Sequence, residues 1–190
     1  ESTDFLLAGL STLEYRGYDS AGLAVLNNGL QRARAKGRVA ELASKVVEGG
    51  INGQVGIAHT RWATHGVPAE RNAHPHISAG LAVVHNGIIE NYESLREQLQ
   101  GLGYVFTSDT DTETIAHLIQ ACFKGQIGEP AENLFSAVQC AVAHLKGAFA
   151  LAVISEEEPD CLVVAREGSP LMLGVAEDGY YAASDASALL

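Results

Sequence analysis

Cysteine, methionine, tryptophan and positive charge are all scarce in this sequence. Its 190 residues contain three Cys, one Met and one Trp, and 12 Lys and Arg against 23 Asp and Glu give a net charge of −11. A nucleic-acid-binding surface needs clustered basic side chains to neutralise phosphates, so we expect no nucleic-acid partner. The densest basic cluster is Arg32, Arg34, Lys36 and Arg38. Its spacing of two predicts a solvated face of an edge strand.

The cysteines Cys122, Cys140 and Cys161 are odd in number and far apart, and each has apolar neighbours. This pattern disfavours a disulfide framework, fits a reducing cytoplasm and predicts buried, inert thiols. No apolar run approaches the roughly 20 residues that a membrane-spanning helix needs. The sequence also opens without the basic and then apolar pattern of a signal peptide. We therefore expect a cytoplasmic protein with no membrane partner.

The apolar residues make up 47% of the chain, which is enough for one globular domain with a core. Thr110 and Glu113 form a capping-box pattern that predicts the start of a helix. Other stretches with helical spacing are 3–14, 39–47, 92–102 and 131–145. Short β-type runs cover 23–26, 54–59, 81–84, 148–154, 161–165, 171–175 and 180–183. Strands at both ends of the chain and helices between them predict an α+β fold with mainly antiparallel sheets.

Residues 59–66, His-Thr-Arg-Trp-Ala-Thr-His-Gly, concentrate the unusual side chains of the chain and include its only Trp. They follow an apolar run and end in a Gly, so we expect them to form a loop that carries binding groups. The guanidinium of Arg61 is suited to grip a carboxylate with two parallel hydrogen bonds. The alternative is a surface arginine that stacks on Trp62.

Two further polar pairs are candidates for the same site. Asn86 and Gly87 follow a buried strand, and an amide with a glycine N–H can form a two-donor oxyanion hole; an ordinary Asn-Gly turn is the alternative. Asp109 and Asp111 precede or open a helix, where carboxylates act as caps; one of them could instead receive an ammonium group. An arginine for a carboxylate and an aspartate for an amine would together define an α-amino acid pocket.

Five of the seven histidines lie between His59 and His85, which makes a metal site conceivable. However, no His-x-x-x-His or His-Glu-x-x-His pattern is present, and we expect neither a metal nor a cofactor. The chain also has no Gly-x-Ser-x-Gly elbow, and no cysteine lies beside a base. The residues therefore indicate substrate-binding groups and an oxyanion hole without a nucleophile.

Taken together, these motifs closely resemble the class II glutamine amidotransferase domain of the glucosamine-6-phosphate synthases, also called glutamine–fructose-6-phosphate aminotransferases (isomerizing). The stretch 59–66 and the Arg-Gly-Tyr-Asp-Ser-Ala-Gly stretch at 16–22 are the most specific. The other matching stretches extend the resemblance over nearly the whole chain and are 72–76, 84–91, 108–113, 168–171 and 184–185. The resemblance implies an N-terminal-nucleophile hydrolase fold, a four-layer αββα sandwich.

The resemblance also implies roles for individual residues. It implies that Arg61 binds the α-carboxylate of L-glutamine, beside Thr64 and His65. It implies that Asp111 and Gly87 bind the α-amino group and that Asn86 and Gly87 form the oxyanion hole. The remaining implied roles are catalytic positioning by Arg16, closure over glutamine by Trp62, and lining of the site by His74.

The family's nucleophile is an N-terminal cysteine whose own α-amine serves as the base. This sequence begins at Glu1, and the match puts that cysteine roughly ten residues upstream, within the span of one strand and turn. We therefore expect a domain over residues 1–190 that is truncated at both ends, without its first strand, its nucleophile or the isomerase domains. Those absent domains would bind fructose 6-phosphate, and the family implies a homodimer for the full-length protein.

Three functions follow from these observations. The first is the glutaminase half of an amino-sugar-forming transferase, inactive as this polypeptide alone. The second is a catalytically dead module that binds glutamine or glutamate. The third is a regulatory or structural protein that reuses the fold.

Overall fold

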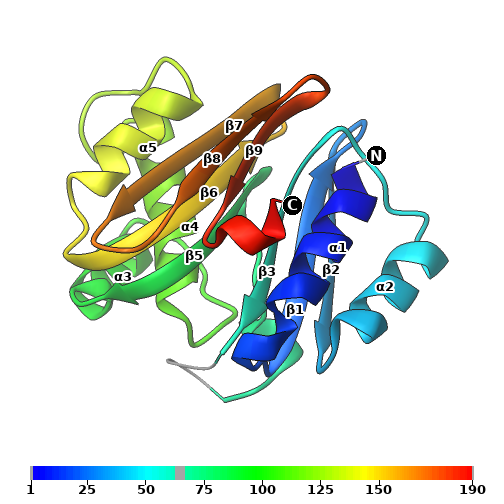
Figure 1. The fold of residues 1–190 in the computed structure, drawn as a ribbon. Coiled ribbons are helices and arrows are strands. Elements are labelled where there is room, and N and C mark those ends of the chain that lie inside the picture. The colour runs from blue at the N-terminus through cyan, green and yellow to red at the C-terminus, as the bar shows by residue number, and fades with distance from the viewer. Residues whose placement is uncertain (1, 63–66, 190) are drawn as a thin grey trace.

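In the computed structural model, which describes residues 2–62 and 67–189, two β-sheets face each other and helices cover their outer faces (Figure 1). The first sheet has the order β2-β1-β3 and the second the order β4-β5-β6-β7. All strand pairs within them are antiparallel. The strands of the first sheet are β1 (Ser20–Leu26), β2 (Leu30–Lys36) and β3 (Val55–Arg61). Those of the second are β4 (His76–Ser78), β5 (Leu81–Ile89), β6 (Gly147–Ser155) and β7 (Glu158–Glu167).

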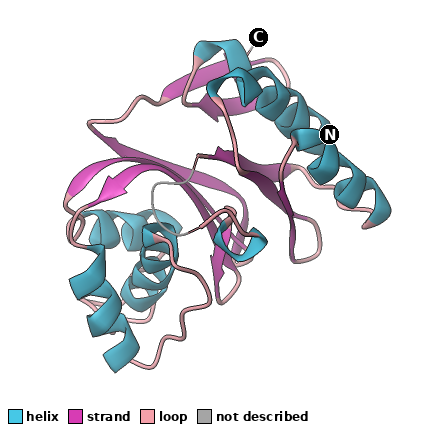
Figure 2. Cartoon of the chain, turned by 90° about the horizontal axis from the view of Figure 1, so that it is seen from below, coloured by secondary structure: helices cyan, strands magenta, loops and turns pink. Residues whose placement is uncertain are grey.

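The helices lie in two groups, one on each outer side of the paired sheets (Figure 2). The first group packs on the β2-β1-β3 sheet and consists of α1 (Ser2–Leu13) and α2 (Val39–Glu48). The second packs on the other sheet and consists of α3 (Tyr92–Gly101), α4 (Asp111–Phe123) and α5 (Leu134–Val142). None of the helices in the described parts of the chain is long and apolar enough to cross a membrane.

Three separate cores hold these layers together, and strand alternation explains why. Successive side chains of a strand point to opposite faces. In β1, Leu23 and Val25 pack with the helical side chains of α1 and α2, whereas Ala24 and Leu26 pack between the two sheets. A third core joins β5, β6 and β7 to the helices on the far side. Strands that bury apolar side chains on both faces therefore produce the αββα layering that the resemblance implied.

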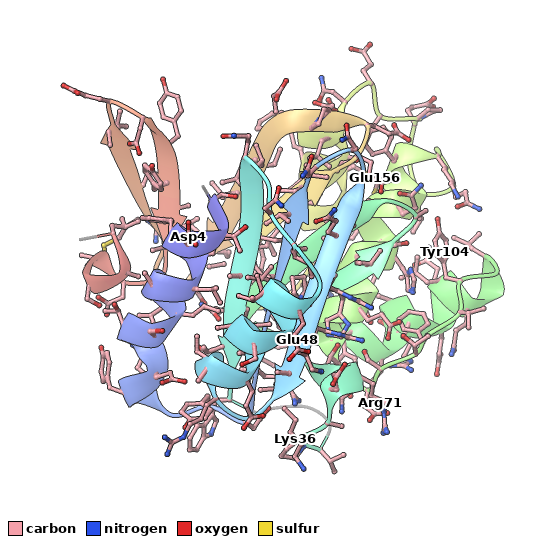
Figure 3. The ribbon with its side chains drawn as sticks, turned by 90° about the vertical axis from the view of Figure 1, so that its right-hand side faces the viewer. Asp4, Lys36, Glu48, Arg71, Tyr104 and Glu156 are labelled. Atoms are coloured by element: carbon pink, nitrogen blue, oxygen red, sulfur yellow. The ribbon has the colours of Figure 1, made fainter. Side chains whose placement is uncertain are left out.

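The chain ends in a separate hairpin of β8 (Met172–Ala176) and β9 (Gly179–Ala183), followed by the short helix η3 (Ala186–Ala188). Two further one-turn helices, η1 (Glu14–Arg16) and η2 (Glu70–Asn72), lie in the loops after α1 and β3. Figure 3 shows Lys36 and Arg71 at one end of the molecule and Glu156 at the other. At the Glu156 end, the carboxylate accepts a hydrogen bond from Leu30 N at 2.6 Å and so links the two sheets.

Several sequence-based boundaries are wrong. The strand β3 continues to Arg61, so His59 to Arg61 belong to the sheet and not to a loop. Asn86 and Gly87 lie inside β5 and pair with Ala150 and Phe149, so they form no turn. Gly87 has a φ of 119°, and a Cβ at this position would lie 2.0 Å from Ala148 O. Glycine therefore permits a close strand approach here without ending the strand.

The edge position of β2 was predicted correctly, but its basic residues are not merely solvated. The Arg34 guanidinium donates hydrogen bonds to the carbonyls of Arg71 and Ala73 at 3.2 and 3.1 Å. Arg32 donates to the carbonyl of Pro75 at 3.2 Å. These bonds hold the loop between η2 and β4 against the first sheet, which places His74 of that loop beside His59 of β3.

Candidate functional site

A cavity of about 1510 Å³ lies between the two sheets and extends under α1 and the β8–β9 hairpin. One part of it is apolar and is lined by side chains of α1, β7 and the hairpin. The other part is polar. It collects the described residues to which the resemblance assigned a role, namely Arg16, Arg61, Trp62, His74, Asn86, Gly87 and Asp111. Thr64 and His65 lie outside the described residues.

Arg61 is the last residue of β3, and its side chain points between the sheets. Its exposed fraction is only 3%, which excludes the surface arginine that the sequence left open. The guanidinium Nη1 lies 3.4 Å from Asp19 Oδ1 and 3.5 Å from the carbonyl of Val67. The second carboxylate oxygen of Asp19 is buried and has no hydrogen-bond partner among the described residues. Asp19, which sequence reasoning missed, thus helps to fix a buried cation at the cavity wall.

Trp62 and Arg16 lie at the mouth of the same cavity. Trp62 is 67% exposed, and its ring covers Gly17, where an added Cβ would lie 2.1 Å from the indole. Gly17 therefore allows the indole to rest on the loop that follows η1. Arg16 is also exposed and pairs with Asp185, while its Nε donates to the Tyr15 hydroxyl at 3.2 Å. An exposed ion pair of this kind contributes little to stability, so the arginine can exchange partners easily.

Asn86 lies in β5 with its side chain toward the first sheet, as strand alternation from the inward-facing Ala82 and Val84 requires. Its Oδ1 lies 2.7 Å from Nε2 of His59 on the opposing sheet. Both Asn86 and Gly87 are exposed to the cavity side of the strand. The amide nitrogen of Asn86 and the backbone of Gly87 are therefore accessible to a molecule in the cavity.

Asp111 is the first residue of α4 and is 4% exposed. Its Oδ2 accepts a hydrogen bond from Ile89 N at 3.0 Å, and its Oδ1 lies 3.9 Å from His85 Nδ1. Asp109, the other aspartate that the sequence considered, is half-exposed and pairs with Arg71 at 2.7 Å away from the cavity. Of these two aspartates, Asp111 is thus the one positioned to receive a positively charged group of a molecule bound in the cavity.

A chain of hydrogen bonds fixes the histidines behind the polar wall. His74 Nδ1 accepts from His85 N at 3.4 Å, so its other nitrogen carries the proton and donates to Thr112 Oγ1 at 3.1 Å. The Thr112 hydroxyl in turn lies 3.1 Å from His85 Nδ1. Burial lowers the pKa of His74 well below its ordinary value, so the ring is neutral. His74 lines the cavity with its ring, while both of its nitrogens have partners.

Gly22, a residue of β1 that sequence reasoning did not single out, makes this arrangement possible. It pairs with Arg34 on one side and His59 on the other, and the carbonyl of His74 lies directly above it. A Cβ at Gly22 would lie 2.0 Å from that carbonyl oxygen. Its absence lets the His74 loop approach the sheet, where the rings of His59 and His74 stack with centroids 4.1 Å apart.

A second polar network surrounds Glu113, on the side of α4 away from the cavity. The predicted N-cap is confirmed, because Thr110 Oγ1 accepts from Glu113 N at 3.3 Å. The other half of the predicted capping box is wrong. The Glu113 carboxylate reaches past Thr110 and accepts hydrogen bonds from the backbone and hydroxyl groups of Thr107 and Ser108. The loop before the helix curls back and presents these donors to the carboxylate.

The cysteines fit the prediction only in part. Cys122 is buried in α4, and burial raises the pKa of its thiol. Cys140 and Cys161 are half-buried, and Cys161 lines the cavity. Burial raises the pKa of the Cys161 thiol as well, which disfavours a thiolate there. Within residues 2–62 and 67–189, no group of three or more His, Cys, Asp or Glu side chains is arranged to hold a metal ion.

Comparisons with known proteins identify the family to which the chain belongs. Residues 59–190 match a family model described as a glutamine amidotransferase domain. The chain is 58% identical over 188 residues to a glutamine–fructose-6-phosphate aminotransferase (isomerizing) of Acidithiobacillus ferridurans, covering 97% of this chain and 30% of that protein. The enzyme of the same name from Pseudomonas putida is 57% identical over 190 residues, with 98% and 30% covered. The chain therefore spans about 30% of the length of these relatives.

Solved structures show the same fold. A glutamine phosphoribosylpyrophosphate amidotransferase from B. subtilis, in complex with ADP and GMP, superposes with a TM-score of 0.84 at 28% identity. The superposition covers 100% of this chain and 40% of that one. The N-terminal-nucleophile amidotransferase fold expected from the sequence is thus confirmed, with its mixed helices and antiparallel sheets.

Proposed function

The chain belongs to the glutamine amidotransferase family, and we propose that it is the glutaminase part of a glutamine–fructose-6-phosphate aminotransferase. In this function, L-glutamine is hydrolysed to glutamate and ammonia, and the ammonia is transferred to fructose 6-phosphate to give glucosamine 6-phosphate. The identity of more than half to relatives of that name, over nearly all of this chain, supports the assignment. The acceptor sugar and a dimeric assembly would involve regions of the relatives outside the matched 30%.

The observation that carries the proposal is the pairing of a buried cation and a buried anion in one cavity. Arg61 receives the α-carboxylate of glutamine, and Asp111 receives its α-ammonium group. A bidentate arginine–carboxylate contact in a buried site is strong and directional, which selects an α-amino acid. Asn86 and Gly87 line the same cavity as Arg61 and Asp111. The side-chain amide of such a ligand would therefore extend toward Asn86 and Gly87.

Asn86 and Gly87 act in this proposal as the oxyanion hole. The N–H groups of alternate residues of a strand point to the same edge. In β5, His85 N donates to His74 and Ile89 N donates to Asp111, so both N–H groups point to the same edge of the strand. Gly87 lies between these two residues, and its N–H is therefore expected on that same edge. When a thiolate attacks the glutamine amide carbon, the carbonyl oxygen gains negative charge, which Asn86 Nδ2 and Gly87 N–H stabilise. The α-amine of the attacking cysteine, which took the thiol proton, passes it to the amide nitrogen, and breakage of the C–N bond then releases ammonia and leaves a thioester that water hydrolyses to glutamate.

The attacking thiol of the family is an N-terminal cysteine, and Arg16 and Trp62 at the cavity mouth are suited to position it and to cover the ligand. None of the three thiols within these 190 residues is suited to replace it, because Cys122 and Cys161 are disfavoured as thiolates and Cys140 does not line the cavity. We therefore propose that the 190-residue polypeptide alone binds glutamate but releases no ammonia. A binding module without catalysis is the second candidate, and the same thiol environment favours it.

The test uses the full-length encoded protein. Ammonia release from L-glutamine is measured for the wild type and for Asn86→Ala, together with calorimetric binding of L-glutamate. We expect the wild type to release ammonia and the variant to lose roughly 10²–10³-fold in kcat, as for removal of one oxyanion donor, with glutamate binding retained. Glutamate binding without ammonia release from the wild type would establish the binding module. No glutamate binding at all would reject both functions.

A further inference from the structure

His59 occupies a special position among the histidines of the cavity, because it links the two sheets at the site. It lies on β3, two residues before Arg61 and on the same strand face. Its Nε2 is 2.7 Å from Asn86 Oδ1 on β5, and its ring stacks on His74 with an interplanar angle of 18°. Neither a metal role nor a contact with the α-amino acid groups accounts for this placement.

We propose that His59 is a positioning residue for the oxyanion hole, in which its Nε2–H donates to Asn86 Oδ1 and holds the Asn86 amide with Nδ2 toward the cavity. The inference rests on the proposed function, since only an acyl-transfer reaction generates the oxyanion that Asn86 would meet. It assigns a role in the reaction to a histidine that touches neither the glutamine carbon nor its charged groups.

The surroundings of the imidazole decide which nitrogen carries the proton. His59 Nδ1 is buried and has no hydrogen-bond partner among the described residues, so a proton there would be a stranded donor. Buried N–H groups without acceptors are rare because they lose their bonds to water without compensation. On Nε2 the same proton meets the amide oxygen of Asn86. Burial lowers the pKa of His59 to about 4, because the hydrogen bond that His59 makes to Asn86 raises this pKa by less than burial lowers it.

The charges nearby act in the same direction as burial. His85 and Arg61 both lower the pKa of His59 through charge repulsion, and the backbone of His85 raises it by less than either repulsion lowers it. The ring is therefore neutral near pH 7 and offers one donor. Its plane is fixed by the stacked His74, whose two nitrogens are both engaged. A neutral imidazole with a fixed plane and a single N–H is suited to select one of the two orientations of an amide.

That selection matters because an asparagine amide is nearly symmetric in shape. A half-turn about its last bond exchanges the oxygen and the nitrogen. One orientation presents an N–H donor to the developing oxyanion, whereas the other presents a lone pair that repels it. With His59 as donor, the second orientation would set two donors against each other at 2.7 Å. The strand that carries Arg61 thus also fixes the donor that acts at the other end of glutamine.

The experiment compares His59→Phe and His59→Gln in the full-length encoded protein. Phenylalanine keeps a flat ring against His74 and removes only the bond to Asn86, because Nδ1 has no partner in the described structure. We expect kcat for glutamine hydrolysis to fall roughly three- to tenfold in His59→Phe, the effect of losing one neutral hydrogen bond. KM for glutamine and Kd for glutamate should change less than twofold. Glutamine restores a donor, so His59→Gln should recover most of the lost kcat.

A double-mutant cycle with Asn86→Ala separates positioning from general structure. If His59 acts through Asn86, adding His59→Phe to Asn86→Ala should lower kcat no further. A further loss in the double variant, an unchanged kcat in His59→Phe, or no recovery in His59→Gln would overturn the proposal. An unchanged kcat in Asn86→Ala alone would instead reject the oxyanion hole on which it rests. Should His59→Phe fail to fold, a two-bond proton–nitrogen NMR spectrum of the wild type decides, since a proton on Nδ1 of His59 contradicts the proposal.

Discussion

Asp111 and Glu113 lie two residues apart in the first turn of α4, and their side chains are almost equally buried, at 5% and 4% exposed. Their surroundings nevertheless differ. The Glu113 carboxylate accepts hydrogen bonds from Thr107 and Ser108 on both of its oxygens. Asp111 accepts one bond from Ile89 N and lines the cavity, which Glu113 does not. Occupancy of the acceptor sites, and not burial, separates a structural carboxylate from one that can bind a ligand.

The largest effect should come from removing the charge that faces the cavity. In Asp111→Asn, the amide oxygen can still accept from Ile89 N, but no charge remains to pair with an ammonium group. We expect L-glutamate to bind about 3 kcal/mol more weakly, the scale of losing one partner of a buried charge pair, with little change in stability. Isothermal calorimetry measures this, with Asp109→Asn as the exposed control two residues away. An equal loss of glutamate affinity in both variants would contradict a ligand-binding role that is specific to Asp111.

Glu113→Gln should have the opposite profile. Glutamine has one acceptor oxygen, and its NH₂ group would meet a backbone N–H of Thr107 or Ser108. We expect the free energy of unfolding to fall by about 2–3 kcal/mol, since buried donors lose a charged acceptor, while glutamate affinity stays within twofold. Urea unfolding measures the change, and Glu97→Gln on the exposed face of α3 is the control. Weaker glutamate binding at unchanged stability would make Glu113 part of the site.

Arg61, the charged residue proposed to bind the α-carboxylate, gives a comparable test. In Arg61→Lys, a single ammonium replaces the planar fork, so one of two parallel bonds to the carboxylate is lost. Glutamate affinity should fall by about 1.5–3 kcal/mol. Calorimetry again provides the measurement, and Arg71→Lys, in the exposed pair with Asp109, is the control. Unchanged affinity in Arg61→Lys would reject the carboxylate role of this residue.

The polar network around Glu113 should also control the stability of the protein in acid. His76 is 2% exposed, and burial lowers its pKa to about 3. As the pH falls from 6.5 toward 4.5, the unfolded chain binds a proton at this residue and the folded chain does not, so stability is lost. For one histidine, the free energy of unfolding then falls by about 1.4 kcal/mol per pH unit. Urea unfolding of His76→Gln between pH 6 and 4.5 should show a slope smaller by about this amount. Equal slopes would mean that His76 titrates normally when folded.

Below that range, Glu113 adds a second loss. Burial alone would raise the pKa of Glu113, but hydrogen bonds from His117, Ser108 and Thr107 lower it overall. A carboxylate with a lowered folded pKa stabilises the protein above the unfolded pKa, and this stabilisation is lost as the pH falls. Acid unfolding should therefore steepen below about pH 4.5 in the wild type and less so in Glu113→Gln.

The sequence predicted the parts of this molecule that depend on local chemistry. Thr110 caps α4 as expected, because a threonine before a helix satisfies a free N–H without help from elsewhere. The fold followed from specific motifs. The continuation of β5 through Asn86 and Gly87 could not be predicted from the sequence, because an Asn-Gly pair favours a turn unless a neighbouring strand, here β6, pairs with it.

Long-range contacts explain what else could not be predicted. His59 and Asn86 are 27 residues apart and belong to different sheets, so their bond exists only once the sheets pack. The approach of His74 to Gly22 likewise depends on Arg34 holding the intervening loop. The one available clue was the concentration of histidines between 59 and 85, which suggested a shared environment without giving the partners.

A crystal structure of the full-length encoded protein with L-glutamate bound is the most direct test. We expect the α-carboxylate on the Arg61 guanidinium, the ammonium group at Asp111, and the side-chain carboxylate within hydrogen-bond distance of Asn86 Nδ2 and Gly87 N. Glutamate bound in the apolar part of the cavity beside β8 and β9, or with its ammonium group away from Asp111, would contradict it.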